Sequence, residues 1–340
     1  MNENVNKYIA EINKKMIVAG NQKMSLDVET GKMGYCLYFF KLSRLLNEPQ
    51  YKMQAEKLLD DIYLELSKAS AERSAYELAQ IGMGIDYLIK QKYMGGNINA
   101  ILSDIDGRIF KKMIFDKLSV TYQPHEIIFV LHFICIRIEE QSKGSDERFI
   151  MEELGIRLLN DLYRSLDPSF YDESMIFNIQ KYKLPQFLYV VSKMYSLQFY
   201  NYRIIEIIRE ISSFVLSRMP VLHSNRLYLL WSLVHLKRVT GWDIWDEQMN
   251  MLISHTDYQK IIFKELRNKD VFILDGVASI YLLIDLLKDM SHPIPFDKTL
   301  FRKRIEESEI WKDEKFAQSL GLINGFSGLL WVYYSIVYEN

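Results

Sequence analysis

The sequence is poor in residues that crosslink a chain or interrupt its helices. Among 340 residues there are two cysteines, Cys36 and Cys135, which cannot build a disulfide framework. Such scarcity is typical of a reducing compartment such as the cytoplasm. The prolines are also few, and all of them lie at the edges of apolar segments, where a helix starts or a loop runs. They are Pro49, Pro124, Pro168, Pro185, Pro220, Pro293 and Pro295.

The sequence also lacks an excess of charge of one sign and long apolar runs. The 42 basic and 44 acidic residues leave a formal net charge of −2, and no basic stripe indicates a nucleic-acid partner. No apolar run approaches the roughly 18 residues of a membrane span. The first residues, MNENVNKYIAEINKK, lack the apolar region of a signal peptide. We therefore expect a cytoplasmic protein that neither spans a membrane nor binds nucleic acid.

The sequence is rich in strongly apolar segments that begin with small or turn-forming residues. These segments recur roughly every 40 to 60 residues, the scale of a two-helix repeat. They begin at Gly31, Ala79, Pro124, Leu184, His223, Leu274 and Leu322.

More polar segments with a single apolar stripe lie between the apolar ones. In one of them Ala55, Leu58, Ile62 and Leu66 repeat at helical spacing. Such segments begin near Val5, Pro49, Asn97, Asp146, Asn201, Asp243 and Asp297. A helix that is apolar all round must be buried, and a striped helix covers it.

This alternation predicts an all-α fold and one domain over residues 1–340. We expect an α/α toroid, a double-layer helical barrel with about seven inner and seven outer helices. An open solenoid would alternate in the same way, but the strongly apolar inner segments favour closure. The best strand candidate is short and isolated, the segment DVFIL at 270–274.

Glycines mark the starts of several apolar segments. Gly31 and Gly34 open the first, and Gly84 is placed near the start of the second. Gly276 opens the sixth, and Asn324 with Gly325 opens the seventh. A single glycine of this kind is explained by helix packing or turn geometry, because it lacks a Cβ atom. The repeated set is more specific than any one glycine.

Three stretches together resemble lanthionine synthetase C-like (LanC-like) proteins. GKMGYCLYFFKLSRLLNEPQYKMQAEKLLDDIY resembles the opening repeat of that family, and GLINGFSGLLWVYY resembles its closing repeat. IGMGIDYLIK, followed by GGNINAILSDIDGRI, resembles the second repeat. The resemblance implies an α/α toroid of seven inner and seven outer helices. It also implies a role in the maturation of ribosomal peptide natural products of the lanthipeptide type.

The resemblance implies a zinc site, and here the sequence departs from the family. Family members that cyclise peptides hold zinc with a cysteine at the fifth inner helix and a Cys-His pair before the glycine of the sixth. In this chain Leu274 and Asp275 precede Gly276, and aligning Asn225 with the fifth glycine puts His223 at the cysteine position. Leucine cannot ligate zinc, and two remaining ligands rarely hold it. We therefore expect neither a bound metal nor another cofactor.

Three hypotheses remain for the function, and the sequence leaves open whether the protein is an enzyme. The first is a zinc-free LanC-like protein that binds a precursor peptide or a partner modifying enzyme. The second is an active peptide cyclase with a rearranged site, in which Asp275, His223 and His125 act as acid–base groups or unusual ligands. The third is a carbohydrate-active α/α barrel that uses mouth carboxylates. Its candidates are Asp86, Glu126 and Asp275, which are all placed near the starts of inner helices.

Overall fold

The computed structural model describes residues 3–68, 73–116, 121–289, 294, 296–316 and 318–338, and in these ranges the regular structure is helical, with no strand. The chain folds into two compact units, each of which is described by itself. Unit 1 comprises Met1–Arg73, Met83–Gly95 and Ile262–Asn340. Unit 2 comprises Ser74–Gly82 and Gly96–Ile261. Among the described helices, none combines the length and apolar character that a membrane crossing requires.

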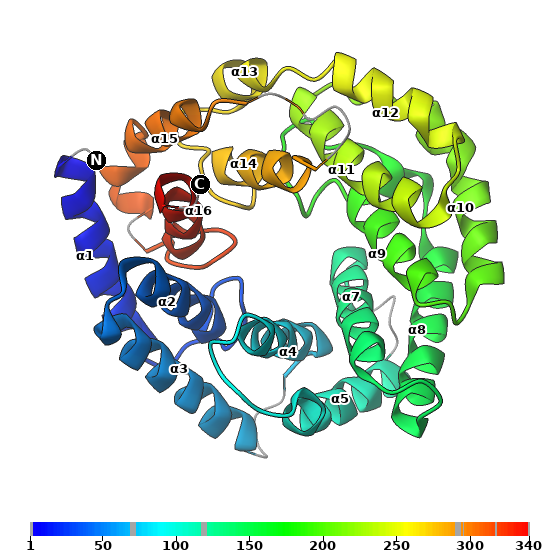
Figure 1. Ribbon diagram of the computed structural model, residues 1–340, viewed down its shortest axis with the longest axis horizontal. Helices are drawn as coiled ribbons and strands as arrows, with labels where there is room; N and C mark the ends of the chain where they lie inside the picture. The colour runs from blue at the N-terminus through cyan, green and yellow to red at the C-terminus, as the bar shows by residue number, and fades with distance from the viewer. Residues whose placement is uncertain are drawn as a thin grey trace. The chain divides into compact units, whose positions relative to one another are not determined.

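Unit 1 is built around three apolar helices that contact one another in succession, α14, α16 and α2 (Figure 1). Helices α1 and α3 lie against α2, and α15 lies against both α14 and α16. The bounds are α1 Glu3–Gly20, α2 Lys32–Leu46, α3 Pro49–Ser67, α14 Val277–Leu286, α15 Lys298–Glu306 and α16 Phe326–Tyr338. Short turns of 3-10 helix, labelled η3 (Glu309–Trp311) and η4 (Glu314–Phe316), follow α15. The boundary between the units falls within α4 (Ala75–Lys90).

Unit 2 repeats this arrangement with α7, α9 and α11 as its apolar series (Figure 1). Helix α8 packs on α7, α10 on α9 and α12 on α11, and α5 contacts α8. The bounds are α5 Ile98–Phe115, α7 Pro124–Glu140, α8 Asp146–Ser165, η1 Pro168–Tyr171, α9 Leu184–Ser196, α10 Asn201–Leu216, α11 His223–Thr240, α12 Ile244–Ser254 and α13 Tyr258–Lys260. A turn of π-helix, η2 (Ile261–Glu265), follows α13.

The two kinds of helix differ in burial as their sequences predict. In the striped helix α10 the buried side chains are Ile204, Ile207, Ile208, Ile211 and Val215, which lie along one face. In α2 every residue from Lys32 to Phe40 is buried. Each predicted apolar segment overlaps one of α2, α4, α7, α9, α11, α14 and α16, although α4 begins four residues before its segment. Each predicted striped segment overlaps one of α1, α3, α5, α8, α10, α12 and α15. The predicted alternation is therefore confirmed.

The described prolines lie where the sequence places them, at helix edges. Pro49, Pro124 and Pro168 are the first residues of α3, α7 and η1, where the missing N–H costs no helical hydrogen bond. Pro185 is the second residue of α9, and Pro220 lies in the loop before α11. The predictions for Pro293 and Pro295 lie outside the described residues.

One local prediction is wrong. Helix α4 begins at Ala75, so Gly84 and Asp86 lie in its C-terminal half rather than near its start. Glycine is needed at position 84 because a Cβ atom would strike the side chain of Met33 on α2. The segment 270–274, the short and isolated strand candidate, is a loop, in agreement with the all-α prediction. Its first carbonyls accept hydrogen bonds from the first amides of α14, so they are not available for a strand partner.

Candidate functional site

Three apolar helices of unit 1 begin with the same backbone construction. In each, the first helical amide donates to a carbonyl seven residues earlier, so that the preceding loop folds back over the helix start. The bonds are Lys32 N to Ser25 O (3.0 Å), Val277 N to Asp270 O (3.1 Å) and Phe326 N to Ser319 O (2.8 Å). The next amide of each helix repeats the seven-residue spacing. The loop carbonyls thus satisfy amides that the first turn of a helix leaves without partners.

A glycine stands directly before each of these helices, and close backbone approach explains it. A Cβ atom at Gly31 would lie 2.5 Å from the carbonyl oxygen of Ser25 and 2.6 Å from the amide nitrogen of Asp27. At Gly276 and Gly325 a Cβ atom would likewise strike the backbone of the preceding loop. The φ angles of Gly31 and Gly276 are −101° and −136°, so space rather than a left-handed conformation requires glycine.

The first of these loops is held by the carboxylate of Asp27. Its Oδ1 atom accepts hydrogen bonds from the amides of Thr30 (2.6 Å) and Gly31 (3.0 Å). An aspartate that binds amides three and four residues ahead fixes a tight turn. Asp27 is not among the residues predicted from the sequence, although an aspartate four residues before a glycine is a usable turn signal.

The three loops are also joined to one another. Leu274 N donates to Ile323 O (2.8 Å), and Ile323 N donates to Glu29 O (3.4 Å). Glycines permit this stacking, because a Cβ atom at Gly321 would strike Glu29 and one at Gly328 would lie 2.9 Å from Ile273 Cδ1. We call loops 25–31, 270–276 and 319–325 together the glycine platform.

The glycine platform brings together most of the predicted site residues of unit 1; Gly84 and Asp86, on α4, are the exceptions. Gly31, Gly276 and Gly325 form its framework, and Asp275 and Asn324 are part of its loops. Gly34 lies in α2 and packs against the first loop, since a Cβ atom there would lie 2.4 Å from Val28 O. Leu274 and Asp275 are half-buried, and Asn324 is exposed. Of the two residues before Gly276, only Asp275 carries a side-chain donor atom for a metal or an acid–base role.

Asp86 is not part of the platform loops. It lies on α4, is 6% exposed and forms an ion pair with Lys90 one turn later (3.1 Å). A carboxylate held by a lysine at i+4 stabilises its own helix.

In unit 2, His223 is the first residue of α11, and its Nδ1 atom faces the backbone of residues 255–257. Nδ1 lies 2.8 Å from His255 O, and the amide of Asp257 donates to it over 3.2 Å. Arg226 strengthens the same junction, since its Nη1 donates to His255 O (2.7 Å). One ring nitrogen of His223 therefore joins α11 to the loop after α12.

Asn225, aligned with a family glycine, has a structural role of its own. It is fully buried, and its Nδ2 atom donates to Glu173 Oε2 (2.9 Å) and to Ser174 O (2.8 Å). Its Oδ1 atom is buried without a hydrogen-bond partner among the described atoms. Asn225 thus anchors the segment after η1 to the start of α11.

His125 and Glu126 lie at the start of α7. Glu126 Oε2 accepts a hydrogen bond from Gln123 N (2.7 Å), which completes a capping box. The ring of His125 meets Tyr76 edge-on, with centroids 5.9 Å apart. Glu126 is therefore engaged in capping its own helix.

The residues present do not fit the zinc that the resemblance implies. A zinc site needs at least three nitrogen, sulfur or carboxylate ligands, and Leu274 offers none of these. Across the described ranges, no group of three or more His, Cys, Asp or Glu side chains could hold a metal ion. Both cysteines are fully buried, and burial raises the pKa of the Cys135 thiol to about 12 and that of Cys36 further still. Neither is available as a thiolate ligand.

Comparison with known proteins identifies the fold. Neither a protein-family model nor a curated protein matches the sequence. The structure matches an α/α toroid of LanC type with a TM-score of 0.71, over 99% of this chain and 95% of the other. That solved structure is nisin cyclase, and the two sequences are 13% identical. The predicted α/α toroid is confirmed, and the resemblance to LanC-like proteins is confirmed at the level of the fold.

Proposed function

We propose that this chain is a cytoplasmic LanC-like protein of ribosomal peptide natural-product maturation, of the lanthipeptide type, that works without zinc. In this proposal it binds a precursor peptide or a partner modifying enzyme. The supporting observation is the contrast within one loop. Gly276 and the hydrogen bonds around it are present, whereas the two positions before it are Leu274 and Asp275 in place of the Cys-His pair that the resemblance implies.

The chemistry of thiol addition favours binding over cyclisation. A cysteine thiol has a pKa near 8.5 and is a weak nucleophile at neutral pH unless a metal or a neighbouring charge makes it a thiolate. A zinc site would supply that activation, and Leu274 removes one of the three ligands that the resemblance implies. A protein that keeps the fold without the activating group is suited to holding a peptide.

The other two hypotheses gain less support. In a rearranged cyclase, His223 would act through Nε2 alone, because Nδ1 is engaged with the loop 255–257. In a carbohydrate-active barrel, Glu126 and Asp86 would have to leave a helix cap and an ion pair. Asp275 is the one candidate that both hypotheses share.

The experiment uses a peptide with cysteine and serine or threonine residues that is encoded beside the gene. The peptide is labelled and titrated with the protein, and binding is followed by fluorescence anisotropy. The dehydrated peptide is then incubated with the protein, and free thiols are counted by alkylation and mass spectrometry. Saturable binding with no thioether formation above the spontaneous rate supports the proposal. Failure to bind both this peptide and its modifying enzyme overturns it.

Two variants separate a binding role from a rearranged catalytic site. If cyclisation is observed and is lost in Asp275→Ala and His223→Ala, the rearranged cyclase replaces the present proposal. Asp104→Ala is the matched control, because Asp104 is an exposed residue of α5 whose side chain is 77% accessible. It should leave both binding and thiol counts unchanged.

A further inference from the structure

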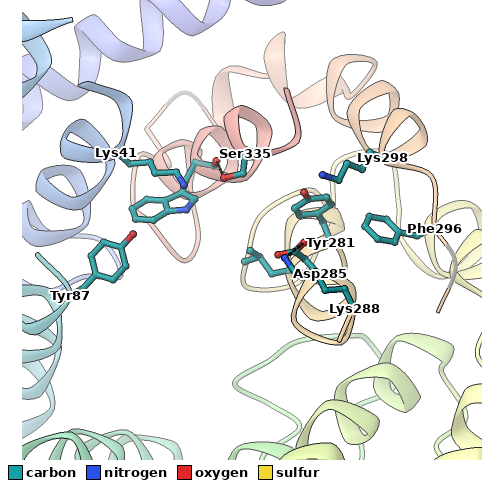
Figure 2. A pocket seen from close by; sticks show the side chains of 10 residues that line it. Lys41, Tyr87, Tyr281, Asp285, Lys288, Phe296, Lys298 and Ser335 are labelled. Atoms are coloured by element: carbon teal, nitrogen blue, oxygen red, sulfur yellow. Dashed lines mark hydrogen bonds and ion pairs between the residues drawn. The ribbon is translucent and has the colours of Figure 1, made fainter. Parts of the chain in front are cut away.

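Unit 1 contains a cavity of about 380 Å³ whose lining side chains contact one another (Figure 2). The Nζ atom of Lys41 lies 5.4 Å from the ring centroid of Trp331, and Asp285 pairs with Lys288 at 3.3 Å. Tyr281 is only 4% exposed. Because these groups are engaged within the chain, they indicate no particular ligand.

Unit 2 contains a larger cavity, of about 540 Å³, between α5 and α8, which contact each other (Figure 1). We call this cavity the α5–α8 groove. Its lining residues recur at helical spacing, so they occupy one face of α5 and one face of the first two turns of α8. They include Asp106, Gly107 and Phe110 on α5 and Glu147, Ile150 and Met151 on α8.

Gly107 leaves space in the groove without a packing reason for glycine. It is an exposed residue inside α5, and a Cβ atom there would meet no described atom within 4 Å. At Gly82, by contrast, a Cβ atom would strike the ring of Phe133. Glycine inside a helix destabilises it relative to alanine. A glycine that costs stability and serves no contact is typical of a position that is kept open for function.

The groove contains a carboxylate that is more than nine-tenths buried. Asp106 is 7% exposed, and its Oδ1 and Oδ2 atoms accept hydrogen bonds from Arg137 Nε (3.0 and 2.9 Å). Burial nevertheless raises the pKa of Asp106, and the attraction of Arg137 offsets only part of that effect. A positive charge in the groove would therefore stabilise this carboxylate.

A second carboxylate lies on the rim of the groove. Glu147 is exposed, and within the described ranges it has no ion-pair partner. The neighbouring Arg148 is engaged by Glu152 (2.7 Å), and none of the described lining residues is basic. Together with Asp146, Glu147 outweighs the partial positive charge of the start of α8. The groove is therefore negatively charged.

The remaining lining offers an apolar surface. Phe110 is half-buried, Ile150 is 41% exposed and Met151 is buried. An apolar group placed against these side chains is removed from water. The ring of Phe110 also attracts a positive charge placed over its face.

We propose that the α5–α8 groove binds a small organic cation that combines an ammonium group with an apolar ring. The carboxylates attract the ammonium group, and the apolar side chains receive the ring. The volume lies within the range of about 300–1,000 Å³ that is usual for small-molecule sites. The proposal does not depend on the proposed role in peptide maturation, because none of its residues belongs to the glycine platform.

The test is a ligand-detected NMR titration of the full chain with 2-phenylethylammonium and with 2-phenylethanol. The two probes share a ring and differ in charge. We expect the ammonium probe to bind with a Kd on the order of 1 mM, as about nine non-hydrogen atoms allow. The alcohol should bind at least ~3-fold more weakly. Raising the salt concentration should weaken only the ammonium probe.

Two variants locate the binding. Glu147→Gln should weaken the ammonium probe by about 2- to 5-fold and leave the alcohol unchanged. Its matched control is Glu153→Gln, because Glu153 is exposed on the same helix and does not line the groove.

Gly107→Leu should weaken both probes by ~10-fold or more, because leucine occupies the space that the ring requires. Its matched control is Ala100→Leu, at an exposed position of α5 outside the groove. Circular dichroism spectra check that all four variants are folded. Equal affinity for the two probes, unchanged binding in Glu147→Gln or Gly107→Leu, or no binding of either probe overturns the proposal.

Discussion

The amide of Leu274 donates a 2.8 Å hydrogen bond to the carbonyl oxygen of Ile323. Leu274 stands where the resemblance to LanC-like proteins implies a zinc-binding cysteine. Its place in the glycine platform is fixed by its backbone, which connects the loop before α14 to the loop before α16. The side chain at this position can therefore change from a ligand to leucine without loss of the hydrogen bonds that hold the loops together.

Replacement of Gly31 by alanine should destabilise unit 1. A Cβ atom there would overlap the backbone of Ser25 and Asp27, and backbone cannot move aside as a flexible side chain can. We expect a loss of about 1–3 kcal/mol in the free energy of unfolding, measured by urea unfolding.

Gly107→Ala is the control for this prediction. Gly107 lies within α5, and a Cβ atom there would meet nothing within 4 Å. Alanine should stabilise that helix by about 0.5–1 kcal/mol. Equal effects of the two substitutions would contradict the role assigned to the glycine platform.

Breaking the buried ion pair of unit 2 should be strongly destabilising. Arg137 is fully buried, and its Nε atom donates to Asp106 Oδ1 (3.0 Å) and Oδ2 (2.9 Å). Arg137→Ala leaves a buried carboxylate without its partner and should cost about 3–5 kcal/mol. Thermal unfolding of the single variant and of the double variant Arg137→Met with Asp106→Leu checks this. The double variant should recover most of the loss, and a double variant as unstable as the single one would refute the argument.

Stability should depend on the protonation of His235. Burial, and then the charges of Arg238 and Lys193, lower its pKa from 6.5 to about 4 in the folded chain. Between pH 6.5 and 4 the unfolded chain therefore binds more protons at this site, so stability falls as the pH falls through this window. Because the ring is partly accessible, we expect an effect of only about 1 kcal/mol.

The matched variant for this prediction is His235→Phe, which keeps a ring against Tyr189 and Trp231. Melting temperatures of both proteins are measured at pH 7, 5.5 and 4.5. The wild type should lose stability relative to the variant as the pH falls. A constant difference across the three pH values would show that His235 does not titrate in this way.

Both cysteines should be inert in the native protein. Cys36 and Cys135 are buried, and burial raises the pKa of both thiols. Reaction with a thiol-specific disulfide reagent should be negligible in buffer and should consume both thiols per chain in denaturant. Rapid reaction of a thiol under native conditions would show that one site opens.

The sequence predicted the parts of the fold that depend on periodicity. The apolar stripe of α10 and the all-round burial of α2 follow from side-chain spacing, which a single sequence displays. The prediction from sequence was wrong where contacts between separate helices determine which residue is needed. Gly84 was placed near a helix start, but it lies in the C-terminal half of α4, where the absence of a Cβ atom leaves room for the side chain of Met33.

The candidate site was predicted in part, for a similar reason. Gly31, Gly276 and Gly325 could be identified as site residues because glycine at the start of an apolar segment is visible in the sequence. The partners that make them necessary, such as the carbonyl of Ser25, are backbone atoms that any residue would provide. The α5–α8 groove could not be identified, because its lining comes from separate segments of the chain that only folding brings together.

The zinc content of the purified protein tests the central claim most directly. Protein prepared without a histidine tag is incubated with zinc, passed through a desalting column and analysed by inductively coupled plasma mass spectrometry. The double variant Leu274→Cys with Asp275→His, which restores the ligand pair that the resemblance implies, is measured in parallel. We predict far less than one zinc per wild-type chain and a higher content in the variant. About one zinc per wild-type chain would contradict the account.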